Sequence, residues 1–260
     1  MKIAIASCMN AKIYTNQPVW RNIEQMNPDA LVLLGDSIYL DIPWVTVVPG
    51  GSIHPSEADA ADFLNHGFEL FRQLLGRPEF ASLISRLGPG KAFAIWDDHD
   101  FLWNGAAGGA MPSKIYGDHF RVTRTLFKAF RTALGKGNPA AFPNSTSDPV
   151  FSSPNEPAPG YQVIDLSSAE KVCLHLTDGR SFRDKHNLLG SAQRAQITLE
   201  MNKRPGWINI LASGIVFNGS KGECWSGFRD DHEWLLRTAQ EHRILVASGD
   251  VHEKPPALAT

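Results

Sequence analysis

Short apolar runs alternate with amphipathic and polar segments along this 260-residue chain. Six runs of four or five mainly apolar residues end in polar or glycine-containing turns, and this pattern predicts buried β-strands. The predicted strands cover residues 3–6, 30–34, 92–95, 172–176, 208–212 and 244–247. Polar clusters follow the carboxyl ends of several of these runs, so the sequence predicts a functional face there.

Four longer segments repeat their apolar residues at helical spacing. The clearest covers residues 55–75 and stops before Gly76. The others are predicted over residues 118–134, from 190 to about 201 and from 230 to about 242. Because strands and helices alternate, the pattern predicts an α/β layered fold.

Residues 135–160 differ from the rest of the chain because they hold six prolines among Ser, Asn and Gly. We interpret this stretch as a long surface loop or a lid over the site. The chain is 43% hydrophobic and 20% charged, a composition that suits one domain spanning residues 1–260.

Charge and cysteine content narrow the function classes. The formal net charge is -2 and Lys and Arg are scattered, so a nucleic-acid-binding or membrane-binding surface is not expected. The three cysteines form no Cys-x-x-Cys pair, and their odd number argues against a disulfide framework. With no signal-peptide pattern and no apolar stretch of membrane-spanning length, the default expectation is a cytoplasmic protein, or a periplasmic or secreted one if a leader was removed.

Three carboxylates and a histidine, Asp97, Asp98, His99 and Asp100, come directly behind the apolar run at residues 92–95. Adjacent carboxylates in an apolar surround repel one another, and a bound cation or a shared proton is the usual resolution. The flanking aromatic side chains make a fully solvated turn a poor interpretation. The cluster therefore predicts part of a metal site.

Three further strand ends carry ligand-type residues. Cys8 follows the first run, Asp36 follows the second run through a glycine, and Asp250 and His252 follow the last. Each has a plainer interpretation on its own: Cys8 as a small buried hydrophobe, Asp36 as a turn cap, and the last two as a hydrogen-bonded core pair. In an extended chain Asp250 and His252 would share one side, which favours metal ligation. No site role is expected for the seven remaining histidines, His54, His66, His119, His175, His186, His232 and His242.

Taken together, seven short stretches in order along the chain resemble the alkaline phosphatase D (PhoD-like) branch of the metallophosphoesterases. They are residues 6–8 (Ala-Ser-Cys), 35–41 (Gly-Asp-Ser-Ile-Tyr-Leu-Asp), 96–101 (Trp-Asp-Asp-His-Asp-Phe), 177–183 (Thr-Asp-Gly-Arg-Ser-Phe-Arg), 188–193 (Leu-Leu-Gly-Ser-Ala-Gln), 213–215 (Ser-Gly-Ile) and 248–252 (Ser-Gly-Asp-Val-His). This resemblance implies a four-layer αββα sandwich that hydrolyses phosphomonoesters or phosphodiesters at a centre of two or more metal ions.

The resemblance also implies roles for individual residues. One metal would be held by Cys8, Asp36, Tyr39 and His252, with Asp36 shared, and the second metal or its surroundings by Asp98, Asn104 and Asp250. His99 would stabilise the phosphoryl group or the leaving oxygen, and Asp97 would face the substrate. The thiolate and phenolate ligands suggest iron with calcium beside it, and manganese or zinc are the alternatives.

The residue types also fit phosphoester hydrolysis when they are considered without the family resemblance. Two bridged cations can acidify a water, hold a phosphate and offset the charge of the attacking and leaving oxygens, so no side-chain nucleophile is required. Arg180 and Arg183 follow the run at residues 172–176 and are candidates for bidentate contacts to a small phosphoester substrate, with Arg180 as a catalytic residue. Their alternative role is an ion pair with Asp178 or Asp184.

The chain departs from the family pattern in three places. The Asp-x-His opening of ordinary metallophosphoesterases is replaced by Ser7-Cys8, and Thr177 and Gly179 stand where the branch has larger residues. The third departure is the short continuation after His252, where relatives add further strands. From it we expect a truncated chain with an incomplete second sheet, and weaker metal binding or lower stability than in a full-length relative.

Two other functions compete with this interpretation. A GDSL-type serine esterase would use Ser37 as nucleophile and His252 as base. Against it, a complete strand and a helix-length segment precede Ser37, and the spacing of Asp250 and His252 does not match that family. A non-catalytic, truncated relative that only binds phosphoesters is the third possibility.

Overall fold

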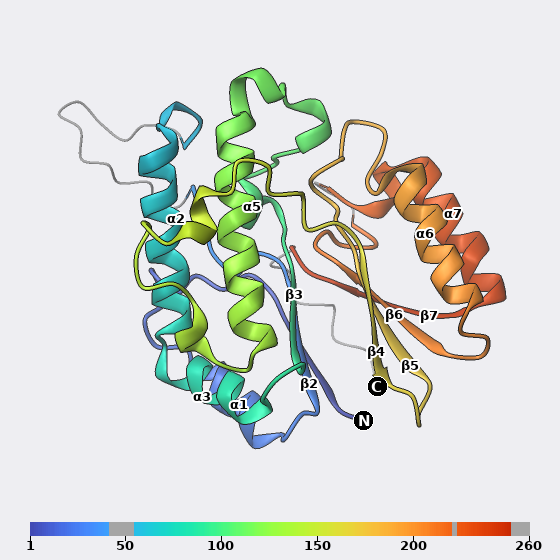
Figure 1. Ribbon diagram of the computed structural model, residues 1–260. Helices are drawn as coiled ribbons and strands as arrows, with labels where there is room; N and C mark the ends of the chain where they lie inside the picture. The colour runs from blue at the N-terminus through green and yellow to red at the C-terminus, as the bar shows by residue number, and fades with distance from the viewer. Residues whose placement is uncertain (42–54, 220–222, 251–260) are drawn as a thin grey trace.

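Two β-sheets lie face to face, and helices cover the outer side of each (Figure 1). The computed structural model describes residues 1–41, 55–219 and 223–250. The first sheet has the order β1-β2-β3 and all its strands are parallel, and the second has the order β4-β5-β6-β7 with only β4 antiparallel to its neighbour. The strands are β1 (Ile3–Ala6), β2 (Ala30–Leu34), β3 (Ala92–Ile95), β4 (Gln162–Ser167), β5 (Val172–Leu176), β6 (Ile208–Ser213) and β7 (Arg243–Ser248).

The helices divide between the two outer layers (Figure 1). On the first sheet lie α1 (Val19–Gln25), α2 (Ala60–Leu75), α3 (Pro78–Leu87) and α5 (Ser113–Gly135), and on the second lie α6 (Gly190–Asn202) and α7 (Arg229–Glu241). The four-residue helix α4 (Asp98–Phe101) follows β3, and short 3-10 turns cover Pro55–Glu57, Gly108–Ala110, Pro139–Ala141, Pro149–Ser152 and Trp225–Gly227. No helix within the described residues is both long enough and apolar enough to cross a membrane.

Strand β2 shows why the layers are stable. Its side chains alternate between Leu31 and Leu33, which pack with the helices, and Val32 and Leu34, which pack with the second sheet. Because both faces of β2 are buried, the strand is an unbroken apolar run. A third cluster, which includes Leu211, joins the second sheet to α6 and α7. The αββα layering expected from the sequence is therefore confirmed.

All six predicted strands are present, but the sequence did not predict β4, α1 or α3. Strand β4 is at the edge of its sheet and none of its residues is fully buried, so it has no continuous apolar run to recognise. The helix predicted over residues 55–75 is interrupted, because Asp59 caps α2 by accepting hydrogen bonds from the backbone of Ala61 (2.9 Å) and Asp62 (2.8 Å). Helix α5 starts five residues earlier than predicted, at Ser113.

The proline-rich segment packs on the outer helices through two phenylalanines. Phe142 and Phe151 are buried, and both rings lie against Phe68 of α2, at centroid distances of 5.5 and 5.8 Å. This part of the segment is therefore fixed to the helical layer. Its last residues continue toward β4 along the side of α5 (Figure 1).

Candidate metal centre

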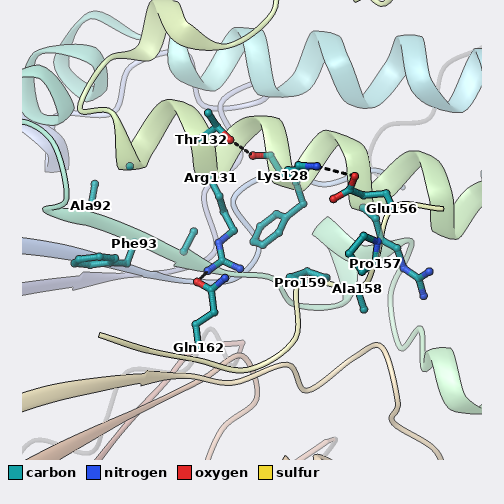
Figure 2. Close-up of a pocket in the computed structure, with 14 residues that line it drawn as sticks. Ala92, Phe93, Lys128, Arg131, Thr132, Glu156, Pro157, Ala158, Pro159 and Gln162 are labelled. Atoms are coloured by element: carbon teal, nitrogen blue, oxygen red, sulfur yellow. Dashed lines mark hydrogen bonds and ion pairs between the residues drawn. The ribbon is translucent and has the colours of Figure 1, made fainter. Parts of the chain in front are cut away.

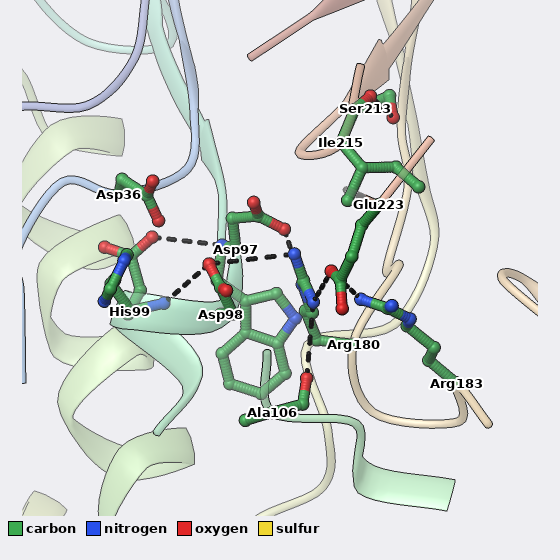
Figure 3. A network of polar contacts seen from close by, with 12 residues as sticks. Asp36, Asp97, Asp98, His99, Ala106, Arg180, Arg183, Ser213, Ile215 and Glu223 are labelled. Carbon is green, nitrogen blue, oxygen red and sulfur yellow. Dashed lines mark hydrogen bonds and ion pairs between the residues drawn. The ribbon is translucent and has the colours of Figure 1, made fainter. Parts of the chain in front are cut away.

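Four aspartates converge where the carboxyl ends of the parallel strands meet. Asp36 follows β2, Asp97 and Asp98 follow β3, and Asp250 follows β7. One carboxylate oxygen from each lies within 4.8 Å of the others, and a second such group contains Asp36, Asp98 and His99 (Figure 3). Residues separated by more than 200 positions in the chain thus form one acidic cluster.

The backbone takes unusual conformations to bring these side chains together. Cys8, Asp36 and Asp250 have φ values of 60°, 51° and 77°, which side-chain-bearing residues adopt rarely and at an energetic cost. Gly35 precedes Asp36 at φ 97°, and a Cβ atom there would lie 2.4 Å from Cβ of Asp97. The extended backbone predicted for residues 250–252 is therefore wrong at Asp250, where the chain turns after β7 ends.

Helix α4 fixes the second half of the cluster. Asp97 and Asp100 form a reciprocal capping box across its first turn. Asp100 accepts hydrogen bonds from the backbone of Asp97 and of Ile38, both at 3.0 Å, and so ties α4 to the loop that carries Asp36. Asp98 accepts the backbone N–H groups of His99 (3.1 Å) and Gly105 (2.7 Å).

The carboxylates raise one another's pKa values. Burial, and then the charges of Asp97, Asp100 and other acidic neighbours, raise the pKa of Asp36 to about 10. For the same reasons the pKa of Asp250 rises to about 7, and burial raises that of Asp97 to about 6 although Arg180 opposes the change. Without a cation the cluster therefore holds protons at neutral pH.

Unsatisfied oxygen atoms show that the cluster suits a cation. Oδ1 of Asp36 and Oδ2 of Asp97 are buried and have no hydrogen-bond partner among the described residues. A buried carboxylate oxygen without a partner is costly, and a metal ion would satisfy it. Several carboxylate oxygens at one point are a donor set for hard cations such as Ca²⁺, Mn²⁺ or a ferric ion.

Cys8 and Tyr39, which the sequence predicts as ligands, lie beside this cluster. Sγ of Cys8 is 3.6 Å from Oδ2 of Asp36 and 3.7 Å from the carbonyl oxygen of Asp250. Tyr39 interacts with Cys8 through its side chain, and its ring centroid is 4.4 Å from that of His99. Burial and the charge of Asp36 raise the pKa of the Cys8 thiol to about 12 and raise that of Tyr39 as well, so metal binding would have to displace both protons.

His99 is held by a carboxylate that the sequence analysis gave no role. Nδ1 of His99 lies 2.6 Å from Oδ1 of Asp41, while Oδ2 of Asp41 accepts the backbone N–H of Asn104 at 2.9 Å. Burial lowers the pKa of His99, but the hydrogen bond to Asp41 and the surrounding carboxylates outweigh it, so the net change is upward. The imidazole is thus oriented through one nitrogen and inclined to carry a proton.

Arg180 is enclosed between the acidic cluster and Glu223 (Figure 3). The side chain is fully buried, and it donates to Asp97 at 2.6 Å and to Glu223 at 2.7 Å. Glu223 also binds Arg183, whose guanidinium lies 5.0 Å from the ring centroid of Phe228. The ion pairs suggested by the sequence, with Asp178 or Asp184, are not the ones that form. A contact between either arginine and substrate stays a prediction.

Two predicted site residues remain, Asn104 and His252. Asn104 is exposed, and its backbone, through Asp41, is the part that joins the site. His252 lies outside the described residues. Sequence reasoning gave no role to Asp41 or Glu223, and it counted Asp100 only as a member of the predicted acidic cluster. Asp41 stands within a motif quoted above, whereas no sequence signal identified Glu223.

Ser37, the nucleophile of the alternative serine esterase, is fully buried and its Oγ has no hydrogen-bond partner among the described residues. A nucleophilic serine needs access to substrate and a base within hydrogen-bond distance. Its position therefore argues against that function.

Comparisons with known proteins bear on the fold. No protein-family model and no curated protein matches this chain. A solved structure titled "Structure of PhoD" is similar over 97% of this chain, with a TM-score of 0.62 and 18% sequence identity. The chain spans about half the length of that protein, of which 51% is covered. The described architecture is therefore a PhoD-like fold.

Proposed function

We propose that this protein is a metal-dependent phosphoric ester hydrolase that acts on phosphomonoesters or phosphodiesters. The observation that carries the proposal is the group of four aspartates, Asp36, Asp97, Asp98 and Asp250, whose oxygens lie within 4.8 Å of one another. In a PhoD-like fold this group stands at the carboxyl ends of the strands.

Two or more cations would be held by the aspartates, with Asp36 shared between them and Cys8 and Tyr39 close enough to contribute. The sequence resemblance adds Asn104 and His252 to this set. When bound, such ions polarise phosphoester oxygens and acidify a water molecule for in-line attack on phosphorus. The thiol and phenol donors favour iron, and the carboxylate oxygens suit a harder ion such as calcium beside it, with manganese or zinc as the alternatives.

His99 would donate a proton to the leaving oxygen. Its hydrogen bond to Asp41 fixes the ring and raises the pKa of the imidazole, which favours the protonated form that a general acid needs. Arg180 would act as a positioning residue, because its charge already offsets that of Asp97 and Glu223. Arg183, at the far side of Glu223, is the better candidate for a contact with the substrate phosphate.

The test combines metal analysis with hydrolysis of a chromogenic phosphodiester and monoester. The purified protein is expected to contain metal and to lose phosphate release after treatment with a chelator. Asp36→Asn should lose both metal and activity, whereas Asp118→Asn, whose side chain is 74% exposed on α5, should retain both. A protein that binds metal but turns over no phosphoester would favour the non-catalytic alternative, and chelator-resistant cleavage of a carboxylic ester that depends on Ser37 would favour the serine esterase.

A further inference from the structure

A cavity lies apart from the acidic cluster, between α5, the edge strand β3 and residues 156–162 (Figure 2). Its volume is about 430 Å³, within the range of roughly 300 to 1,000 Å³ that is typical of small-ligand sites. None of its lining residues belongs to the candidate metal centre. The proposed hydrolase chemistry therefore gives this cavity no role.

Helix α5 contributes three cationic side chains to the lining, Arg124, Lys128 and Arg131, at positions that share one stripe of the helix. Figure 2 shows Lys128 and Arg131. Lys128 is paired, since its Nζ lies 2.8 Å from Oε2 of Glu156. Glu156 is the only carboxylate among the lining residues that the structure describes. The two arginines have no such partner.

Arg131 donates to the amide oxygen of Gln162 and lies over the ring of Phe127, with 5.9 Å between Cζ and the ring centroid. Nε of Arg124 is buried and has no hydrogen-bond partner within the described part of the chain. Neither guanidinium forms an ion pair with any described carboxylate. Arg124 also lies over an aromatic ring, with 5.7 Å between its Cζ and the centroid of Phe120. Two positive charges thus face the cavity without a carboxylate in ion-pair contact.

Asp178 is the acidic group whose charge reaches both arginines, but its oxygens are already engaged. They accept hydrogen bonds from the Ser181 hydroxyl (2.6 Å), the Trp96 indole (2.9 Å) and the Gly160 backbone (3.2 Å). Burial lowers the pKa of Arg131 to about 10, so the side chain remains charged at neutral pH. A half-enclosed cation without an ion-pair partner is costly to the fold, and a bound anion would offset that cost.

Apart from Thr132 and Gln162, the rest of the lining has no polar side chain. Phe93 and Ala92 of β3 form one wall, and Pro157 and Pro159 form the opposite one (Figure 2). Rings and prolines present flat surfaces that suit a planar group. The cavity therefore has a cationic side and an apolar side.

We propose that this cavity binds a small organic oxyanion, with its charged group against Arg124 and Arg131 and a flat apolar body between Phe93 and the two prolines. The cationic side of the cavity would bind the charged group of the ligand, and the apolar side would bind its flat body. The proposal stands independently of the hydrolase function, because it uses none of the same residues.

The probe for this site is 1-naphthoate, measured by isothermal titration against the wild-type protein. We expect saturable binding of one probe per chain. Inorganic phosphate supplies the charge alone and 1-naphthol the apolar body alone, so each should bind at least about tenfold more weakly. Arg124→Gln and Arg131→Gln should each weaken 1-naphthoate binding by about tenfold or more, because each removes a charge-assisted hydrogen bond.

Two controls separate binding from folding and from the metal centre. Arg237→Gln, on a side chain 69% exposed on α7, should leave the affinity unchanged. Arg131→Gln should melt at or above the wild-type temperature, since it removes a half-enclosed charge that no carboxylate pairs with. Asp36→Asn should bind 1-naphthoate as the wild type does.

Four results would overturn the proposal. They are the absence of saturable binding at roughly millimolar probe, unchanged affinity in both arginine variants, equal affinity for 1-naphthol or inorganic phosphate, and loss of binding in Asp36→Asn.

Discussion

Replacing Asp36 by asparagine should stabilise the metal-free protein, and the gain should depend on pH. Asp36 is 2% exposed, and its pKa is raised to about 10 by burial and by the neighbouring carboxylates. At neutral pH the folded chain therefore keeps this carboxyl protonated, while the unfolded chain, where the pKa is 3.8, ionises it. Unfolding then releases a proton, which favours the unfolded state as pH rises.

The size of the effect follows from the pH and the unfolded-state pKa. Below pH 4 the group is protonated in both states, so it has little influence on the free energy of unfolding. Between pH 4 and pH 7 each pH unit costs about 1.4 kcal/mol, which reaches about 4 kcal/mol at pH 7. This figure does not depend on how far the folded-state pKa lies above 7. Asparagine has nearly the shape of a protonated aspartic acid and does not ionise, so Asp36→Asn should recover most of that energy.

Urea unfolding of chelator-treated protein at several values between pH 4 and pH 7 measures this difference. The free energies of unfolding of wild type and Asp36→Asn should nearly coincide at pH 4 and diverge toward pH 7, while Asp118→Asn should follow the wild type throughout. Added metal should reverse the order, because the wild type gains a bound ion and the variant lacks a ligand. A gain that is absent at pH 7, or equal at all pH values, would refute the electrostatic reasoning.

Three further predictions concern the surroundings of the cluster. His99→Asn should lower kcat by roughly 10²- to 10⁴-fold, and Asp41→Asn should move the alkaline limb of the pH–rate profile to lower pH, because it removes the partner that raises the pKa of the imidazole. Arg180→Met should destabilise the protein by about 3–5 kcal/mol in urea unfolding, since it leaves a buried carboxylate uncompensated, whereas Arg229→Met on an 86% exposed side chain should change little. Ser37→Ala should retain chelator-sensitive phosphoester hydrolysis because Ser37 is fully buried, and loss of activity with normal metal content would contradict the metal-centred mechanism.

The positions of the site residues at the strand ends could be predicted because the buried strands form continuous apolar runs in the sequence. β2 is apolar on both faces, so its run of five residues and the Gly35-Asp36 that follows it stand out. The same reasoning located Asp97 and Asp98 behind β3. Strand β4 was not predicted, because an edge strand with partly exposed faces has no continuous apolar run.

The partners that hold the site together could not be predicted, because they come from distant loops. His99 and Asp41 are 58 positions apart, and Arg180 reaches Asp97 across 83 positions. Glu223, which joins Arg180 to Arg183, follows no recognisable strand or helix pattern. Such pairings depend on how loops pack at the strand ends, and local propensity carries no information on them.

Three of the five non-glycine residues at positive φ in the described chain belong to the proposed site. They are Cys8, Asp36 and Asp250. The strained backbone at these positions disfavours the folded state, and so does the repulsion among the carboxylates that they bring together. Asp100 and Arg180 offset part of this cost, since one accepts two backbone hydrogen bonds and the other neutralises Asp97. Both are buried and neither is needed to explain the core, so their place in the fold is to hold the acidic cluster together. A bound cation would offset the repulsion that remains among these carboxylates, so we expect the stability of this protein to rise and fall with its metal content.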